Sequence, residues 1–416
     1  MDYQSPRLEV ESRPGLPLNV GKTKDIARVD RVKISPNTLS DACFYPSELA
    51  LDLQDCGLSQ AVIKEVLACA WEYVRCLIPH YTNWSRYITF CRVISIACVA
   101  EYNGHMVKAT KDGLLLGHRL EDLLDIIFAG TPGHAEMVRE FQTFMLVTTT
   151  KTSDERNSEL FCRYIEILAK NPKDWFRLRD CDALLRFTIM AALRCNDLDD
   201  VWFQEDEFQI LTELGDALYD SVAFYKHRAE GEASNTYAYA GESVRTESFR
   251  QYRQVLWALD VSWAQSPAHR CVVNLLRNFG GPIHMTMRRY RFVEDDLMLG
   301  LPETERIISE AKKNVKLWYR QEATEGHRYD KLDTSYTTTL ANAEAYISGF
   351  TSILQLAGVE RCTSCCYDYA YGASSRGEFS GVQLCNSCRT EWQSYMTCFP
   401  QRVTFVFPCL KGALQS

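Results

Sequence analysis

Four cysteines near the C-terminal end of the sequence have the spacing of a metal site. Cys362 and Cys365 form one Cys-x-x-Cys pair, Cys385 and Cys388 form a second, and nineteen residues separate the pairs. Two such pairs can close a tetrahedral thiolate site around Zn²⁺. Four cysteine ligands leave no open coordination position, so we expect a structural zinc rather than a catalytic one. Two alternatives stay open: Cys366 replaces Cys365 as a ligand, or the four thiols bind no metal.

Three glutamates interrupt apolar helical stretches early in the chain. Glu65 and Glu72 lie seven residues apart on one stripe of the helix predicted in KEVLACAWEYVRC, and Glu101 closes the apolar run ISIACVAE. Burying a carboxylate is costly unless a cation or a metal compensates its charge. We therefore take all three as candidate site residues, with a solvated helix surface as the alternative for each.

A second acidic pair lies on the helix predicted in ELGDALYDSVAFYKHRAEGE. Asp216 and Asp220 are four residues apart, so their side chains project from one face. Helical bundles hold divalent metals between paired carboxylates of this kind. Lys226 lies just off the stripe, within reach of a phosphate group. An exposed helix face with charges of both signs is the alternative.

Two basic groups are candidates for binding an anion such as a diphosphate. WFRLRDCDALLRF puts Arg179, Asp182 and Arg186 on one stripe of a predicted helix, and MTMRRYRFVE contains Arg289 and Tyr290. A guanidinium offers a planar fork to two phosphate oxygens and stays charged in an apolar setting. Ordinary ion pairs between helices are the competing explanation for these arginines.

The elements that must position these residues are helices. Apolar residues recur at helical spacing through most of the chain, without a useful alternating, strand-like series. Residues 1–42 are polar and aperiodic, which predicts a mobile leader. Residues 43–356 form the predicted helical domain, and residues 357–416, rich in Cys, Gly, Ser and Tyr, form the predicted zinc module. The weakly periodic residues 236–248 are either a lid-like loop or a connection.

Composition and charge narrow the class of protein. The 416 residues are 46% hydrophobic and carry a net charge of −8 without a lysine- or arginine-rich run, which argues against nucleic acid or an anionic membrane as the main partner. The most apolar stretch, residues 87–100, is too short for a membrane span. The N-terminal residues lack the apolar region of a signal peptide, and many cysteines stand singly in apolar runs. We therefore expect a cytoplasmic protein; the oligomeric state stays open.

Several longer strings resemble a known family. ACAWEYVRCLIPHYTNWSRY, DWFRLRDCDALLRFTI, CNDLDDVWF, GDALYDSVAFYKHRAEGE and FGGPIHMTMRRYRFVE are similar to the fungal α-ionylideneethane synthases, unusual sesquiterpene synthases of abscisic acid biosynthesis. The resemblance runs over about residues 45–294 and resumes at the paired cysteines. It implies an all-α fold, a large helical bundle resembling class I terpene synthases, with a small C-terminal zinc-binding module.

The resemblance also implies an activity. Family members convert farnesyl diphosphate into (2Z,4E)-α-ionylideneethane through β-farnesene and allofarnesene, so this chain is expected to be a magnesium-dependent lyase that releases diphosphate. By position, Glu65 and Glu101 match glutamates that we assign to magnesium. Asp216 and Asp220 sit where class I synthases carry their second metal motif. The Asn-x-x-x-Ser-x-x-x-Glu string of class I enzymes is missing, which leaves the number of magnesium ions open.

The resemblance extends to the diphosphate and to the proton steps. Arg289 and Tyr290 resemble the Arg-Tyr pair that grips diphosphate in microbial synthases, and Arg179 and Lys226 are expected to help. Glu72 and Asp182 are the leading candidates for moving protons, because each shares a helical stripe with a proposed metal or diphosphate residue. Aromatic walls around the carbocations are expected from Trp71, Tyr73, Trp84, Phe187, Tyr219 and Phe224.

Two acidic stretches imitate motifs of terpene cyclases. Glu121-Asp122-Leu-Leu-Asp125 resembles an aspartate-rich metal motif but also reads as an acidic helix start. Asp197-Leu-Asp199-Asp200 resembles the Asp-x-Asp-Asp proton donor of another cyclase class but also reads as a turn between helices. Two other functions compete with the main reading: a synthase with a different linear or cyclic sesquiterpene product, and a non-enzymatic helical scaffold whose zinc module binds a protein.

Overall fold

The computed structural model describes residues 44–54, 56–102, 104–107, 114–153, 158–290, 292, 297–311, 334–357, 361–368 and 379–415. Residues 44–416 form one compact unit. The predicted leader, residues 1–42, lies outside the described residues.

The fold is all-α, as predicted. The helices are α2 (Gln60–Leu77), α3 (Trp84–Tyr102), α4 (Leu120–Phe128), α5 (His134–Lys151), α6 (Glu159–Leu168), α7 (Pro172–Ala183), α8 (Leu185–Arg194), α9 (Glu205–Glu230), α10 (Thr236–Ala240), α11 (Arg245–Ser262), α12 (Pro267–Phe279), α13 (Ile283–Thr286), α14 (Glu303–Ala311), α15 (Ser335–Ala341), α16 (Phe350–Ala357), α17 (Asn386–Thr397), α18 (Phe399–Val406) and α19 (Lys411–Gln415). Short 3₁₀ turns are η1 (Ser47–Leu51), η2 (Gly104–Val107), η4 (Glu242–Val244), η5 (Arg288–Tyr290), η6 (Ala343–Ala345) and η7 (Pro408–Leu410).

Strands are confined to two antiparallel pairs within the described ranges. β1 (Leu114–Leu115) pairs with β2 (His118–Arg119), and β3 (Cys366–Asp368) pairs with β4 (Gly381–Gln383). None of the helices in the part of the chain that the structure describes is long and apolar enough to cross a membrane.

The helix starts follow from capping residues. The side chains of Ser59, Ser158, Asn171 and Ser266 accept hydrogen bonds from backbone N–H groups in the first turns of α2, α6, α7 and α12. These side chains satisfy donors that have no partner inside the helix. A proline opens both α7 and α12, where its missing N–H costs nothing.

One helix predicted as continuous is broken. Leu184 adopts a left-handed conformation (φ 54°), so α7 ends one residue before it and α8 begins one residue after it. Arg186 therefore does not continue the stripe of Arg179. Its guanidinium binds Asp180 at 3.1 Å and Glu205 at 2.5 Å in an interhelical ion-pair network.

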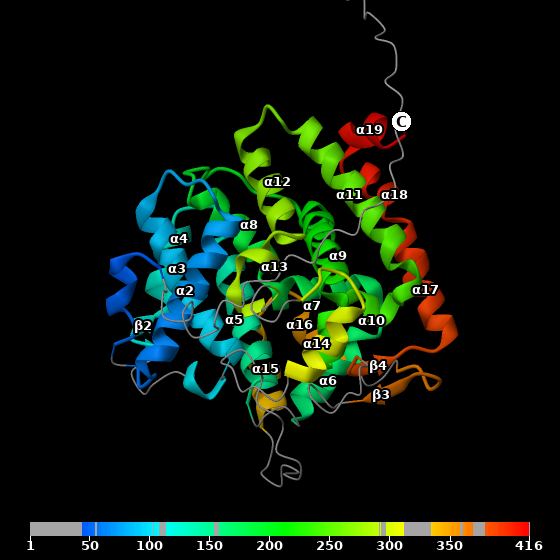
Figure 1. Cartoon of the computed structure of the whole chain (residues 1–416), viewed down its shortest axis with the longest axis horizontal. Coiled ribbons are helices and arrows are strands. Elements are labelled where there is room, and N and C mark those ends of the chain that lie inside the picture. The colour runs from blue at the N-terminus through cyan, green and yellow to red at the C-terminus, as the bar shows by residue number, and fades with distance from the viewer. Residues whose placement is uncertain are drawn as a thin grey trace, which may run out of the picture. The chain divides into compact units, whose positions relative to one another are not determined.

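Helix α9 is the hub of the bundle. It packs against α7, α8, α10, α11, α12, α14 and α18 and lies in the middle of the view in Figure 1. Gly215 makes this close packing possible, because a Cβ there would overlap the Leu185 side chain and press on Leu276. The helix ends at Gly231, which has φ 67°. The most crowded helix of the fold thus carries the Asp216/Asp220 pair.

The segment predicted as a lid or a connection begins as a buried helix and continues as a more exposed turn. Its first residues form α10, of which Thr236, Tyr237, Tyr239 and Ala240 are buried. The segment then passes through η4 into α11. Its position against α9 gives α10 a part in the site.

The C-terminal helices share the core of the bundle. Trp392, Phe399 and Val403 belong to the same hydrophobic cluster as the residues of α2 to α12. In Figure 1 the helices α17 to α19 are orange to red; α18 and α19 pack against α11, and α17 packs on α10. The predicted boundary between residues 356 and 357 stays a prediction.

A buried ion pair ties α18 to α9. Glu213 is completely buried, and its carboxylate accepts two hydrogen bonds from Arg402, at 2.5 and 2.7 Å. The hydroxyls of Tyr252 and Tyr395 donate to the same carboxylate at 2.7 and 2.9 Å. These donors all bind the Glu213 carboxylate, so its buried negative charge is well compensated. Glu213 lies one turn before Asp216.

Candidate active site

Asp216 is the carboxylate with the most unusual surroundings. It is completely buried on α9, and neither of its oxygens has a hydrogen-bond partner. Burial raises the pKa of Asp216 well above its ordinary value, and the nearby charge of Arg179 offsets only part of this effect. A buried acceptor pair without a donor is rare in native proteins and calls for an absent partner or a proton.

Asp220, one turn later, is fully engaged. It receives hydrogen bonds from the Arg179 guanidinium at 2.8 and 3.3 Å. The backbone N–H and the hydroxyl of Thr236 donate to it at 2.7 and 2.8 Å. Burial opposes the charge of Arg179, but the two aspartates outweigh it and hold the pKa of Arg179 above its ordinary range. The structure therefore brings Arg179, Asp216 and Asp220 together, across α7 and α9.

Asp182 belongs to the same cluster. It forms an ion pair with Lys151, from the end of α5, and lies 3.5 Å from Arg179. Burial alone would raise the pKa of Asp182, but the charges of Lys151 and Arg179 outweigh it, and the pKa falls below its ordinary value. Asp182 is thus held as a carboxylate.

A second group of predicted residues gathers where α2 and α3 meet η5. Glu101 forms an ion pair with Arg289. Glu72 accepts hydrogen bonds from the side chain of Arg288 at 2.7 Å and from its backbone N–H at 3.1 Å.

The Cys69 thiol on α2 lies close to this second group of residues. Its pKa is raised by burial. The charges of Arg289, Glu72 and Glu65 also act on this pKa, so each of these three groups lies in the neighbourhood of Cys69. Glu65 itself is partly exposed on α2.

Tyr219 and Tyr290 join the two groups. The rings lie 5.9 Å apart at 72°. Arg179 lies over the Tyr219 ring at 5.6 Å, and Arg289 over the Tyr290 ring at 5.7 Å. Lys226 lies 5.8 Å from the centre of the Tyr290 ring and forms an ion pair with Glu230 at 2.7 Å. The predicted cations are thus connected through two aromatic rings, as residues around one anion would be.

The predicted aromatic wall is only partly found here. Tyr219 is in the site, and the Tyr73 hydroxyl, bonded to Thr188 at 2.9 Å, is close enough for Tyr290 and Arg289 to affect its pKa. The other four rings pack elsewhere: Trp71 with Trp84, Phe187 with Phe90, Phe128 and Phe141, and Phe224 with Tyr225, Tyr237 and Phe379.

The two imitations of cyclase motifs have structural roles. Asp197 adopts φ 52° and accepts hydrogen bonds from Asn83 and Thr82, which together lower its pKa. Asp199 pairs with Arg86 at 2.6 Å. These residues form a turn between α8 and α9. Glu121 is an exposed residue of the acidic first turn of α4.

Three site residues were missed at the sequence level. Lys151 and Thr236 hold Asp182 and Asp220, and no spacing rule connects residues so far apart in the chain. The third, His284, stood in the quoted string FGGPIHMT without a role. A histidine inside an apolar stretch was the available signal for it.

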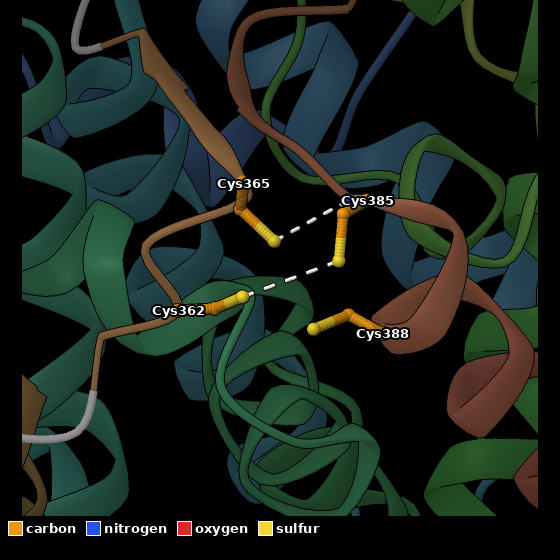
Figure 2. A group of neighbouring side chains, drawn as sticks. All are labelled: Cys362, Cys365, Cys385 and Cys388. Carbon is orange, nitrogen blue, oxygen red and sulfur yellow. Dashed lines mark hydrogen bonds between the residues drawn. The ribbon is translucent and has the colours of Figure 1, made fainter.

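The four predicted cysteine ligands converge at the C-terminal end of the fold, as Figure 2 shows. Their sulfurs all lie within 4.8 Å of one another, and those of Cys362 and Cys385 are 4.0 Å apart. Sulfurs at a tetrahedral zinc lie about 3.8 Å apart, given Zn–S bonds of about 2.3 Å. The backbone N–H of Cys385 also donates to the Cys365 sulfur at 3.4 Å. The cluster has the composition and spacing to hold a metal ion.

Among the described residues, this cysteine group is the one place where three or more potential ligands converge. The predicted magnesium ligands Glu65, Glu101, Asp216 and Asp220 do not form such a group. Glu101 is paired with Arg289 and Asp220 with Arg179, whereas both oxygens of Asp216 are unpaired.

Comparisons with known proteins agree with the resemblance. A family described as "Alpha-ionylideneethane synthase aba3" matches residues 41–409. The chain is 50% identical to alpha-ionylideneethane synthase aba3 of Botryotinia fuckeliana (strain B05.10), over 89% of this chain and 84% of that protein. It is 46% identical to alpha-ionylideneethane synthase abl3 of Leptosphaeria maculans, over 90% and 88% of the two chains. It is 42% identical to the abl3 protein of Pyricularia oryzae (strain Y34), over 90% and 84%. Because the family match extends over most of the chain, the protein belongs to the alpha-ionylideneethane synthase family.

Proposed function

We propose that this protein is a sesquiterpene synthase that converts farnesyl diphosphate into (2Z,4E)-α-ionylideneethane and releases diphosphate. The relatives are named alpha-ionylideneethane synthases, which supports this product. The cluster of buried carboxylates and arginines supports a reaction that releases diphosphate. The reaction would supply abscisic acid biosynthesis and take place in the cytoplasm.

The observation that carries the proposal is the bare carboxylate of Asp216. It lies beside the charged Arg179, deep in the bundle, with both oxygens unpaired. An acidic group left in this way fits a metal that arrives with the substrate. Mg²⁺ prefers carboxylate and phosphate oxygens and usually binds through one or two carboxylates plus the substrate.

The other proposed magnesium ligands are Glu65, Glu101 and Asp220. Glu101 is paired with Arg289, and Asp220 with Arg179. We infer an exchange of partners in which the diphosphate takes the guanidinium groups of Arg289 and Arg179 and frees carboxylate oxygens for the metal. Magnesium would supply the charge that draws diphosphate off the allylic carbon.

Lys226 and Tyr290 complete the proposed diphosphate site. Lys226 is nearly buried and lies over the Tyr290 ring, and this ring adjoins Arg289. Cations held in a water-poor site act strongly on a multiply charged anion. The Tyr219 ring lies beside them and is suited to stabilising an allylic cation through its face.

The reaction passes, in our proposal, through neutral β-farnesene and allofarnesene. A proton must therefore leave the first cation and another must be added later. Glu72 and Asp182 remain the carboxylates predicted for these steps. Each is paired with a cation, Glu72 with Arg288 and Asp182 with Lys151, and the lowered pKa of Asp182 leaves that carboxylate able to accept a proton rather than to donate one.

The cysteine cluster has a separate proposed role. We propose that Cys362, Cys365, Cys385 and Cys388 bind one structural Zn²⁺ as thiolates. Cys385 directly precedes α17, and Gln393 of that helix donates to the Ala240 carbonyl of α10 at 2.9 Å. The metal would fix the start of a helix that buttresses the element holding Asp220.

The test is incubation of purified protein with farnesyl diphosphate and MgCl₂, followed by gas chromatography and mass spectrometry. We expect a cyclic C15 hydrocarbon and stoichiometric diphosphate. Formation of a different sesquiterpene would show that the proposed product is wrong and that the proposed reaction class is right. No turnover at saturating magnesium would favour the scaffold function instead.

A further inference from the structure

His284 is a completely buried histidine with no assigned task. It lies in the four-residue helix α13, directly after Gly280-Gly281-Pro282. Neither ring nitrogen makes a hydrogen bond of ordinary geometry, although the Tyr219 backbone is close enough to the imidazole to raise its pKa. Buried imidazoles normally satisfy at least one nitrogen. A bare one points to a function that needs the nitrogen free.

Aromatic rings surround the imidazole. The ring centres of Tyr219, Tyr290 and Phe292 lie 4.4, 5.3 and 5.2 Å from that of His284. This box adjoins the proposed diphosphate site, because Tyr219 also contacts Arg179 and Tyr290 also contacts Arg289. His284 therefore lies one aromatic ring away from both guanidinium groups.

The imidazole is kept neutral. Burial, with a smaller contribution from the charge of Lys226, lowers the pKa of His284 to about 3. The neutral ring has a lone pair ready to accept a proton. Once protonated, it is a much stronger acid than an exposed imidazolium, because its surroundings oppose the charge.

We propose that His284 is the proton carrier of the reaction: it takes a proton from the farnesyl cation and returns one to the neutral polyene. This inference rests on the proposed function. In the first step a nitrogen lone pair accepts a proton from the methyl group at C3. The C–H electron pair becomes a C=C bond, so a neutral open-chain hydrocarbon with four C=C bonds and an imidazolium form. In the second step a C=C electron pair takes the N–H proton, which regenerates neutral imidazole and a new cation for ring closure. The cyclic cation then loses a proton to the neutral imidazole, and the C–H electron pair becomes the last C=C bond of the product.

The position explains why this group suits both steps. An aromatic box stabilises a cation near its face, whether the cation is the allyl group or the imidazolium. Lys226, whose charge acts on the imidazole, repels the imidazolium and favours return of the proton. Asp182, in contrast, has a lowered pKa and holds no proton to donate near neutral pH.

The experiment compares the full-length protein with His284→Gln and with His269→Gln, a matched control. His269 is a partly buried histidine that hydrogen-bonds Ser266 at the start of α12. Each protein is given farnesyl diphosphate and MgCl₂, and diphosphate release and hydrocarbon products are measured separately.

For His284→Gln we expect diphosphate release within a few-fold of wild type. The cyclic product should fall by about 100-fold or more, the usual range for loss of an acid–base group. The output should move to open-chain hydrocarbons and alcohols, and His269→Gln should match wild type. If His284→Gln does not fold, His284→Phe, which fills the aromatic box without a titratable group, is tested in its place.

A second readout follows the proton itself. Substrate deuterated at the C3 methyl group should return part of its label to another carbon of the cyclic product, because one buried carrier accepts and donates. An unchanged product ratio in the folded variant, or a product without returned label, overturns the proposal. Parallel loss of diphosphate release overturns it too, since His284 would then act in ionisation. Wild-type protein that makes no hydrocarbon refutes the proposed function instead.

Discussion

Replacing Asp216 with asparagine should make the metal-free protein more stable while abolishing turnover. The side chain is completely buried, and both oxygens lack a partner. The variant keeps the shape of the side chain and removes the ionisable group. It therefore isolates the cost of holding a bare carboxyl group in the core.

The size of the effect follows from the protonation of that group. Neutral pH lies about three units above the ordinary Asp pKa of 3.8, and each unit is worth about 1.4 kcal/mol. A buried carboxyl can always avoid its charge by keeping its proton, so Asp216 costs at most about 4 kcal/mol at pH 7. An unpaired asparagine amide costs about 1–3 kcal/mol, about as much as an unpaired neutral carboxyl group, so these two costs offset each other. We expect Asp216→Asn to raise the free energy of unfolding by up to about 4 kcal/mol at pH 7.

The sign of the pH dependence is fixed. The folded pKa of Asp216 is raised, so between pH 4 and that pKa the folded protein holds a proton that the unfolded chain has lost. The contribution of Asp216 to stability therefore falls by about 1.4 kcal/mol per unit as pH rises. The variant lacks this slope, and its advantage should vanish towards pH 4. Magnesium should stabilise the wild type more at higher pH, because only the carboxylate binds metal.

The assay is urea unfolding followed by circular dichroism at pH 5, 6 and 7, with and without MgCl₂. Chelators are left out so that a bound zinc stays in place. Asp220→Asn is the matched control; it should be destabilised, because it weakens the buried pair with Arg179. A less stable Asp216→Asn protein at pH 7, or an unchanged pH slope, would refute the reasoning.

Three further predictions test other parts of the structure. Arg402→Leu leaves the Glu213 carboxylate buried without its counter-ion and should cost about 3–5 kcal/mol of stability in urea unfolding; a loss below 1 kcal/mol would mean that the pair is not buried in solution. Glu101→Gln should lower turnover by about 100-fold or more, because an amide is a poor magnesium ligand; near-normal turnover in a magnesium titration would remove Glu101 from the proposed ligand set. Cys385→Ser should abolish zinc in elemental analysis and lower the melting temperature, and an intact zinc content would contradict the ligand assignment.

The sequence predicted what local spacing determines. Helical periodicity identified the fold, and the four-residue spacing of Asp216 and Asp220 correctly put both on one buried helix face. The Cys-x-x-Cys pairs were confirmed as one cluster, because each short loop presents its two sulfurs to the same side.

Features that depend on tertiary packing were not predictable. Leu184 breaks a helix although leucine is a strong helix former, since packing overrides local propensity. The partners of the carboxylates come from distant segments, as with Thr236 on Asp220 and Arg289 on Glu101. The burial of His284 among three aromatic rings depends on tertiary contacts that the sequence does not show.

The pairing of Glu213 with Arg402 has a consequence for how the protein is made. The two residues are 189 positions apart, so a ribosome synthesises the whole of α9 long before the arginine emerges. Until then, burying α9 would trap an uncompensated charge one turn from Asp216. Domains commonly begin to fold while still being synthesised. Here the helix that carries the proposed chemistry can settle only after residue 402 has been added, which ties assembly of the site to translation of a segment far downstream of α9.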